Sequence, residues 1–233
     1  MAPHPDGVGV SARDRILGRL RAGPAVAPVP LPDVQGWIQA RRRDEGRAAR
    51  VERLRAALLA ARAEVHDSSE AAWPELLGAL CVAKGLRTLL VGTAAESQRQ
   101  RHSGLPAGVR VLDCDTPADA WRQRLFGDVD AALTRARSAI ADTGSLVLWC
   151  GPGEPRTLSL VPPVHIVLLA TDAIHADLPA ALQSEAWPQG LATNVVLASG
   201  PSKTADIQQT LAYGAHGPRQ LVVILLHAHM DAL

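Results

Sequence analysis

The chain has 233 residues, and its 24 Lys and Arg side chains nearly balance 23 Asp and Glu, so the formal net charge is +1. This charge provides no field that would attract nucleic acid or a polyacidic partner, and an aromatic content of 3% leaves few rings for base stacking. Cys81, Cys114 and Cys150 are widely spaced and form no CxxC pair, which argues against a zinc or iron–sulfur site and favours buried thiols.

The N-terminal region predicts a helix followed by an extended linker. Ser11 is suited to cap a helix that runs to Arg21, and Gly23 ends it. Prolines at positions 24, 28, 30 and 32 then favour an extended chain, because proline fixes φ and lacks an N–H donor. The sequence shows no signal peptide and no apolar run long enough to cross a bilayer, so we expect a cytoplasmic protein that is not integral to a membrane.

A second long helix is predicted from Trp37 or Asp44 to about Val65. The apolar residues that recur there at helical spacing are Val51, Leu54, Leu58 and Val65. The Arg41–Arg43 run has two interpretations, a phosphate-binding patch or a solvated helix start that nearby carboxylates neutralise. The second is favoured because no aromatic residues are interleaved with the arginines.

From about residue 69 onward, short apolar runs alternate with amphipathic segments. Expected strands span 88–92, 109–112, 129–133, 145–149, 165–169, 194–197 and 221–226, and expected helices span 69–84, 118–125, 173–184 and 204–213. Such alternation predicts an α/β fold with a mostly parallel sheet covered by helices on both faces. We therefore divide the chain into an N-terminal helical extension with a Pro-rich linker, residues 1–66, and an α/β domain, residues 67–233.

The loop between the last two expected strands carries the densest polar chemistry. Gly200 permits a close approach of the backbone to a ligand. The candidate polar side chains of the loop are Ser199, Ser202, Lys203, Thr204 and Asp206. With a helix starting at Thr204, free backbone N–H groups and a lysine would suit a phosphate or carboxylate. The alternative is that Ser202 or Thr204 only caps the helix. The loop matches neither a Walker P-loop nor a hydrolase nucleophile elbow.

Four further places in the sequence carry polar groups. His216, between two glycines, is either an acid–base group at a cleft edge or a side chain bonded to its own turn. The Asp142-Thr143-Gly144-Ser145 segment forms either a turn or part of a ligand wall, and Arg156 could pair with a ligand carboxylate. His165 opens an apolar run and is expected to be a core or strand-edge histidine.

These segments occur in an order that resembles the LUD-domain family, and within it the lactate utilization protein C (LutC/YkgG) group. The resemblance spans roughly residues 67–226 and rests on the runs 139–145, Arg156 with 160–166, 199–207 and 214–218. Asp142 and Ser145 stand where the family often has glutamate and threonine, which keeps the functional groups. The resemblance implies a three-layer α/β/α sandwich similar to the NagB/RpiA/CoA-transferase-like group.

The resemblance also implies work in L-lactate oxidation to pyruvate, as a non-redox component that binds a small carboxylate or anion. It implies iron–sulfur partner proteins of the LutA and LutB types that hold the clusters, with no cofactor or metal in this chain. The catalytic candidates are His216, Asp142 and Lys203, and the ligand-binding candidates are Thr143, Gly144, Arg156, Ser199, Gly200, Ser202, Lys203, Thr204, Asp206 and His216. The alternative is an independent small-molecule enzyme, such as a formyltetrahydrofolate cyclo-ligase or a CoA-transferase-like protein.

Overall fold

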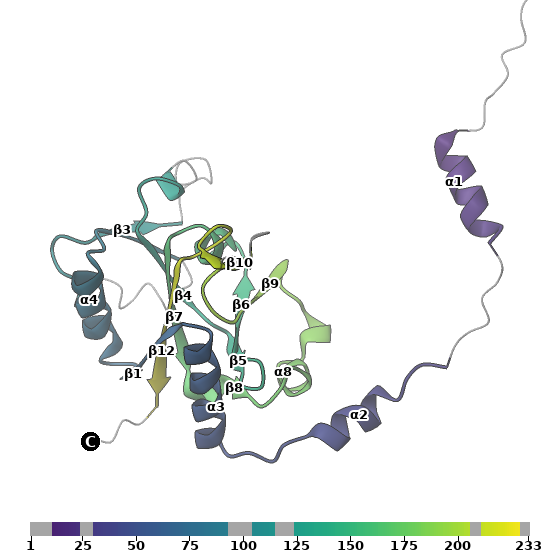
Figure 1. Cartoon of the computed structure of the whole chain (residues 1–233), viewed down its shortest axis with the longest axis horizontal. Coiled ribbons are helices and arrows are strands. Elements are labelled where there is room, and N and C mark those ends of the chain that lie inside the picture. The colour runs from purple at the N-terminus through teal and green to yellow at the C-terminus, as the bar shows by residue number, and fades with distance from the viewer. Residues whose placement is uncertain (1–10, 24–29, 93–103, 115–123, 206–210, 229–233) are drawn as a thin grey trace, which may run out of the picture. The chain divides into compact units, whose positions relative to one another are not determined.

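The computed structural model describes residues 11–23, 30–92, 104–114, 124–205 and 211–228 (Figure 1). The chain divides into two compact units, Met1–Arg42 and Arg43–Leu233. The first unit contains α1 (Ala12–Arg21) and α2 (Val34–Arg41), neither of which has a buried residue. The Ser11 hydroxyl accepts a hydrogen bond from the Asp14 N–H at 3.1 Å, which confirms the predicted N-cap.

A six-stranded sheet forms the centre of the second unit. Its strands in spatial order are β1 (Glu64–Ser69), β12 (Gln220–His227), β7 (Val164–Ala170), β4 (Ala131–Arg135), β2 (Thr88–Val91) and β3 (Arg110–Asp113). All five neighbouring pairs are parallel. The predicted α/β class and mostly parallel sheet are therefore confirmed.

A second sheet of four strands packs beside the first and was not expected from the sequence. Its order is β8 (Ile174–His175), β5 (Ser138–Ile140), β6 (Ser145–Cys150) and β9 (Asn194–Ala198). The runs 145–149 and 194–197 are strands as predicted, but they pair antiparallel with each other in this second sheet. An apolar run indicates a buried strand without indicating which sheet it joins.

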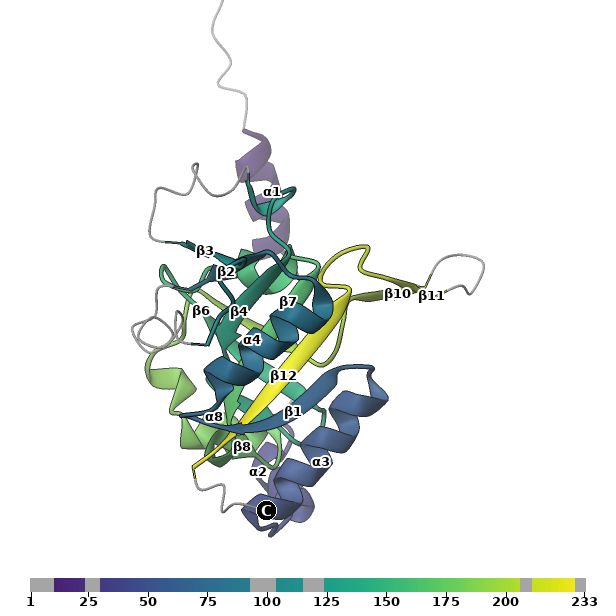
Figure 2. The same ribbon diagram turned by 90° about the vertical axis from the view of Figure 1, so that its left-hand side faces the viewer.

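Helices cover both faces of the parallel sheet. On one face α4 (Trp73–Lys84) packs through Leu77 and Cys81, and Figure 2 shows it lying over the sheet. On the other face α3 (Arg47–Ala60) packs through Leu54 and Leu58 together with the inner side of the four-stranded sheet. The four-residue α7 (Thr157–Leu160) and α8 (Leu178–Ser184), with 3-10 turns at Thr171–Ala173 and Trp187–Gln189, complete the unit. No helix among the described residues is both long and apolar enough to cross a bilayer.

Two helix predictions need correction at their ends. The helix expected to reach Val65 is interrupted: α2 ends at Arg41, α3 begins after Gly46 and ends at Ala60, and Val65 lies in β1. The helix expected from Ser69 begins only at Trp73, because Ser69 is the last residue of β1, whereas its end at the left-handed Gly85 (φ 64°) is as predicted. Because α3 packs in the core, the second unit begins well before the predicted boundary at residue 67.

The helix predicted over 204–213 is wrong within the described residues. Lys203–Ala205 forms β10 and Leu211–Tyr213 forms β11, and the two strands pair antiparallel. The Ser202 N–H donates to the Pro218 carbonyl at 2.8 Å and the Ser202 carbonyl accepts from the Gly214 N–H at 2.9 Å, which ties the two ends of the hairpin together. The helix predicted over 118–125 falls mainly on residues outside those described.

The position of α3 in the core predicts unequal effects of two neighbouring leucines. Leu58 is fully buried, whereas the Leu59 side chain is 53% exposed. Leu58→Ala should lower the free energy of unfolding by about 2–5 kcal/mol, because it leaves a cavity, and Leu59→Ala by less than about 0.5 kcal/mol. Urea denaturation of both variants measures this, and equal losses would show that α3 does not pack as described.

Candidate functional site

Two glycines of the predicted ligand loops, Gly144 and Gly200, pack against the C-terminal end of α3. A Cβ atom added at Gly144 would lie 2.6 Å from the Ala57 Cβ, and Gly144 has a φ of 65°. The turn between β5 and β6 therefore requires glycine at this position for two reasons, the close contact and the left-handed backbone. A Cβ added at Gly200 would lie 3.0 Å from both the Cβ and the carbonyl oxygen of Ala61. Both predicted ligand loops are thus placed against the same end of one helix.

A chain of three hydroxyl groups joins these loops. The Thr143 Oγ1 lies 2.7 Å from the Ser145 Oγ, which lies 2.8 Å from the Ser199 Oγ. Ser145 is buried, whereas Thr143 and Ser199 are exposed. The structure therefore brings Thr143, Gly144, Ser199 and Gly200 together from two segments that are distant in the sequence.

A cleft of about 530 Å³ opens beside this junction. Among the residues that line it are Arg62, Ser199, Gly200, Lys203 and Tyr213. The Arg62 guanidinium carbon lies 5.2 Å from the centre of the Tyr213 ring, and Lys203 is the cross-strand neighbour of Tyr213. Arg62 and Tyr213 were not predicted from the sequence, because an arginine just after a helix and a lone tyrosine carry no motif.

The cleft lies toward the amino ends of β1 and β12. Arg62 is two residues before β1, and β11, which pairs with the strand of Lys203, is followed by β12 after the segment 214–219. Lys203 stands in the strand β10, so the described residues of this loop do not give the positive helix end that the sequence predicted. Anion binding in this cleft would therefore depend on side chains instead.

The segment around His216 contacts the Ser202 loop. A Cβ added at Gly217 would lie 3.0 Å from the Ser202 Cβ. His216 itself is exposed and does not line the cleft. Thr204 lies on β10 opposite Ala212, and Asp206 lies outside the described residues.

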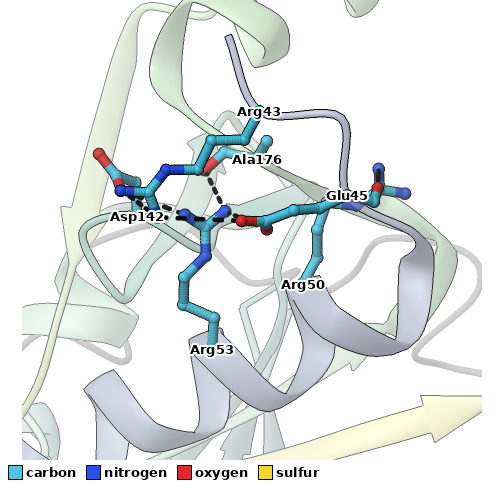
Figure 3. A network of polar contacts seen from close by, with 6 residues as sticks. All are labelled: Arg43, Glu45, Arg50, Arg53, Asp142 and Ala176. Atoms are coloured by element: carbon cyan, nitrogen blue, oxygen red, sulfur yellow. Dashed lines mark hydrogen bonds and ion pairs between the residues drawn. The ribbon is translucent and has the colours of Figure 1, made fainter. Parts of the chain in front are cut away.

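Asp142 points to Arg53 of α3 (Figure 3), and it is not among the residues that line the cleft. One of its carboxylate oxygens lies 3.2 Å from the Arg53 Nη1 and 3.8 Å from the Arg43 Nη1. Arg53 also donates to the Ala176 carbonyl at 3.1 Å and pairs with Glu45 at 2.8 Å. In this arrangement Asp142 ties the β5–β6 turn to α3.

Arg156 lies at the far end of β9 from the cleft. Its Nη1 is 3.5 Å from the Oδ1 of Asn194, the first residue of β9, whereas Leu197 near the other end lines the cleft. The structure therefore does not bring Arg156 together with Lys203.

A second polar cluster lies at the carboxyl end of the parallel sheet, where ligands of such sheets commonly bind. The Glu154 Oε1 is buried and has no hydrogen-bond partner among the described residues, and burial raises the pKa of this carboxyl to about 7. Glu154 packs on Gly92 just past β2, where an added Cβ would lie 2.6 Å from the Glu154 Cγ. Arg135, the last residue of β4, opposes this rise in pKa and also pairs with Glu70. Sequence reasoning missed Glu154, because a glutamate in a Gly/Pro-rich loop carries no signal of burial.

His165 is a core residue, which the sequence predicted. Its side chain is 1% exposed, and its Nε2 lies 2.9 Å from the Thr134 Oγ1 on the adjacent strand. Complete burial lowers the pKa of His165 to about 3, so the ring is neutral at ordinary pH and takes the place of an apolar core residue.

The family model of the LUD domain matches residues 12–226. The chain belongs to the LUD-domain family. An uncharacterized protein of Neisseria meningitidis is 38% identical over 222 residues, which cover 93% of this chain and 94% of that protein. A crystal structure of a DUF162 family protein from Deinococcus radiodurans shares 25% identity and a TM-score of 0.55, and covers 78% of this chain and 99% of its own.

Other relatives of this chain are named lactate utilization protein C. The one from Deinococcus radiodurans is 34% identical over 130 residues, or 53% of this chain, and the one from an Exiguobacterium species is 33% identical over 102 residues, or 42% of this chain. The matched segments span 60% and 44% of those two proteins. The predicted resemblance to the family is therefore confirmed.

The contact between Gly144 and α3 predicts a large effect of one methyl group. Gly144→Ala should destabilise the LUD-domain fold by at least about 1 kcal/mol, because alanine is strained at this φ and its Cβ would clash with Ala57. Gly151→Ala is the matched control, since an added Cβ there has no atom within 4 Å. Thermal unfolding of both variants measures this difference in stability, and similar melting temperatures would contradict the contact between Gly144 and Ala57.

The raised pKa of Glu154 predicts a pH-dependent difference between the wild type and Glu154→Gln. Between the usual pKa near 4.5 and about 7, the folded protein holds a proton that the unfolded chain releases, so this carboxyl stabilises the fold less as pH rises. The variant should therefore gain up to roughly 3 kcal/mol over the wild type between about pH 5 and about pH 8.5. Urea denaturation across this range tests it, and parallel pH profiles would contradict it.

Proposed function

We propose that this protein is a non-redox component of a lactate-utilization system and binds a small carboxylate or anion in the cleft beside Lys203. The membership in the LUD-domain family, with relatives named lactate utilization protein C, supports the cellular role. The single structural observation that supports ligand binding is that Lys203, Ser199 and Gly200 line one cleft. A lysine and a hydroxyl group on the wall of a cleft suit an anionic ligand.

The electron carriers of this system are assigned to partner proteins. Oxidation of L-lactate to pyruvate releases two electrons and two protons, so it needs an acceptor. The three cysteines of this chain are buried and spread over separate segments, so we assign the iron–sulfur clusters to partners of the LutA and LutB types. We propose that the assembly works in the cytoplasm, where cysteine thiols stay reduced.

A second candidate function is an independent small-molecule enzyme on the same fold. Glu154 favours it, because a buried carboxyl with a pKa raised to about 7 at the carboxyl end of β2 resembles a catalytic acid or base. Stabilisation of the protein by a nucleotide or a coenzyme A derivative in a thermal-shift assay, with none by lactate or pyruvate, would favour this function.

The proposed role is tested by growth on L-lactate. A strain of the source organism that lacks this gene should fail to grow on L-lactate and recover with the wild-type gene. Lys203→Ala should restore growth poorly at unchanged protein level, whereas Arg110→Ala, which removes an exposed charge on β3 at the opposite edge of the sheet from β1, should restore it fully. Normal growth of the deletion strain would contradict the lactate role, and full recovery with Lys203→Ala would contradict the ligand site.

A further inference from the structure

Arg62 has a backbone conformation that normally requires glycine. Its φ is 67°, in the left-handed region, directly after the C-cap of α3 at Ala61. Its N–H donates to the Leu59 carbonyl and the following Ala63 N–H to the Leu58 carbonyl, both at 2.9 Å, which is the hydrogen-bond pattern of a glycine-terminated helix. Glycine would adopt this turn without strain, so an arginine here is unfavourable for folding alone.

The same conformation places the Arg62 side chain on the wall of the cleft. Its guanidinium lies over the Tyr213 ring, and Lys203 stands opposite Tyr213 on the paired strand. Side chains opposite each other on paired strands share a face, so two cations lie near one aromatic ring. Neither Arg62 nor Lys203 forms an ion pair in the part of the chain that the structure describes, whereas Arg53 and Arg55 of α3 both do.

We propose that Arg62 binds the carboxylate of the ligand of this cleft, with Lys203 as the second cation. A guanidinium can hold both oxygens of a carboxylate at once, which gives it the leading role over the single ammonium group. This inference rests on the proposed function and adds to it a residue and a mode of binding.

The chain of three hydroxyl groups indicates a second polar group on the ligand, besides its carboxylate. The exposed Ser199 end of the Thr143–Ser145–Ser199 chain lies in the same cleft as Arg62, and a serine hydroxyl can both donate and accept a hydrogen bond. A carboxylate with a hydroxyl or oxo group on the adjacent carbon would contact the guanidinium and the Ser199 hydroxyl together. The ligand class is therefore a 2-hydroxy or 2-oxo acid, and the cleft of about 530 Å³ has room for a longer acid than lactate.

A purely structural role for Arg62 gives a different expectation. A cation at a helix C-terminus that also covers an aromatic ring stabilises the fold. Under that role, Arg62→Gly would change stability only and would leave ligand binding as it is.

The experiment is isothermal titration of the full-length protein with pyruvate, L-lactate and acetate, alongside thermal unfolding. Arg62→Gly should raise the melting temperature, because it removes the left-handed strain, and should weaken pyruvate and lactate binding at least about tenfold. Arg62→Lys, which keeps charge and strain, should retain more affinity than Arg62→Gly. Acetate should bind the wild type more weakly than pyruvate, and Ser199→Ala should remove that preference.

Two results would overturn the inference. Unchanged pyruvate and lactate affinity in Arg62→Gly would assign the residue a structural role. If neither acid binds to the wild type, the proposed ligand class is wrong. If the wild-type gene still restores growth on L-lactate in that case, the cellular role stands and only this inference fails.

Discussion

The close packing of two glycine turns on the C-terminal half of α3 is the contact on which the candidate site depends. Leu54 and Leu58 hold this helix between the parallel sheet and the four-stranded sheet. With the helix fixed there, Gly144 and Gly200 can approach it only because they lack side chains. That approach aligns three hydroxyl groups and brings the loop before Lys203 to the end of the helix, where Arg62 follows.

The molecule carries polar chemistry at both ends of its parallel sheet, and the two ends differ in kind. The cleft near the amino ends of β1 and β12 combines two cations, an aromatic ring and hydroxyl groups. At the opposite end, Glu154 is held beside the ends of β2 and β4, with one carboxyl oxygen buried and unpartnered among the described residues. The first suits binding of an anion, and the second suits exchange of a proton. The cationic cleft and the buried carboxyl of Glu154 thus lie at opposite ends of the parallel sheet.

Local sequence signals predicted the elements better than their assembly. The buried strands, the Ser11 and Gly85 caps and the core position of His165 follow from apolar runs, capping residues and composition, which act within a few residues. The paired strands β10 and β11 fall where a helix was predicted over 204–213. Hydrogen bonds of Ser202 to Gly214 and Pro218 hold this pair, and these residues lie outside the predicted helix. The second sheet and the cleft residue Arg62 likewise depend on contacts between distant segments, which periodicity does not encode.

A crystal structure of the protein with pyruvate tests the central claim most directly. We predict density for the carboxylate within hydrogen-bond distance of the Arg62 guanidinium, with the oxo group toward the Ser199 hydroxyl. Pyruvate bound instead beside Glu154 at the carboxyl end of β2, with the cleft at Arg62 empty, would contradict it.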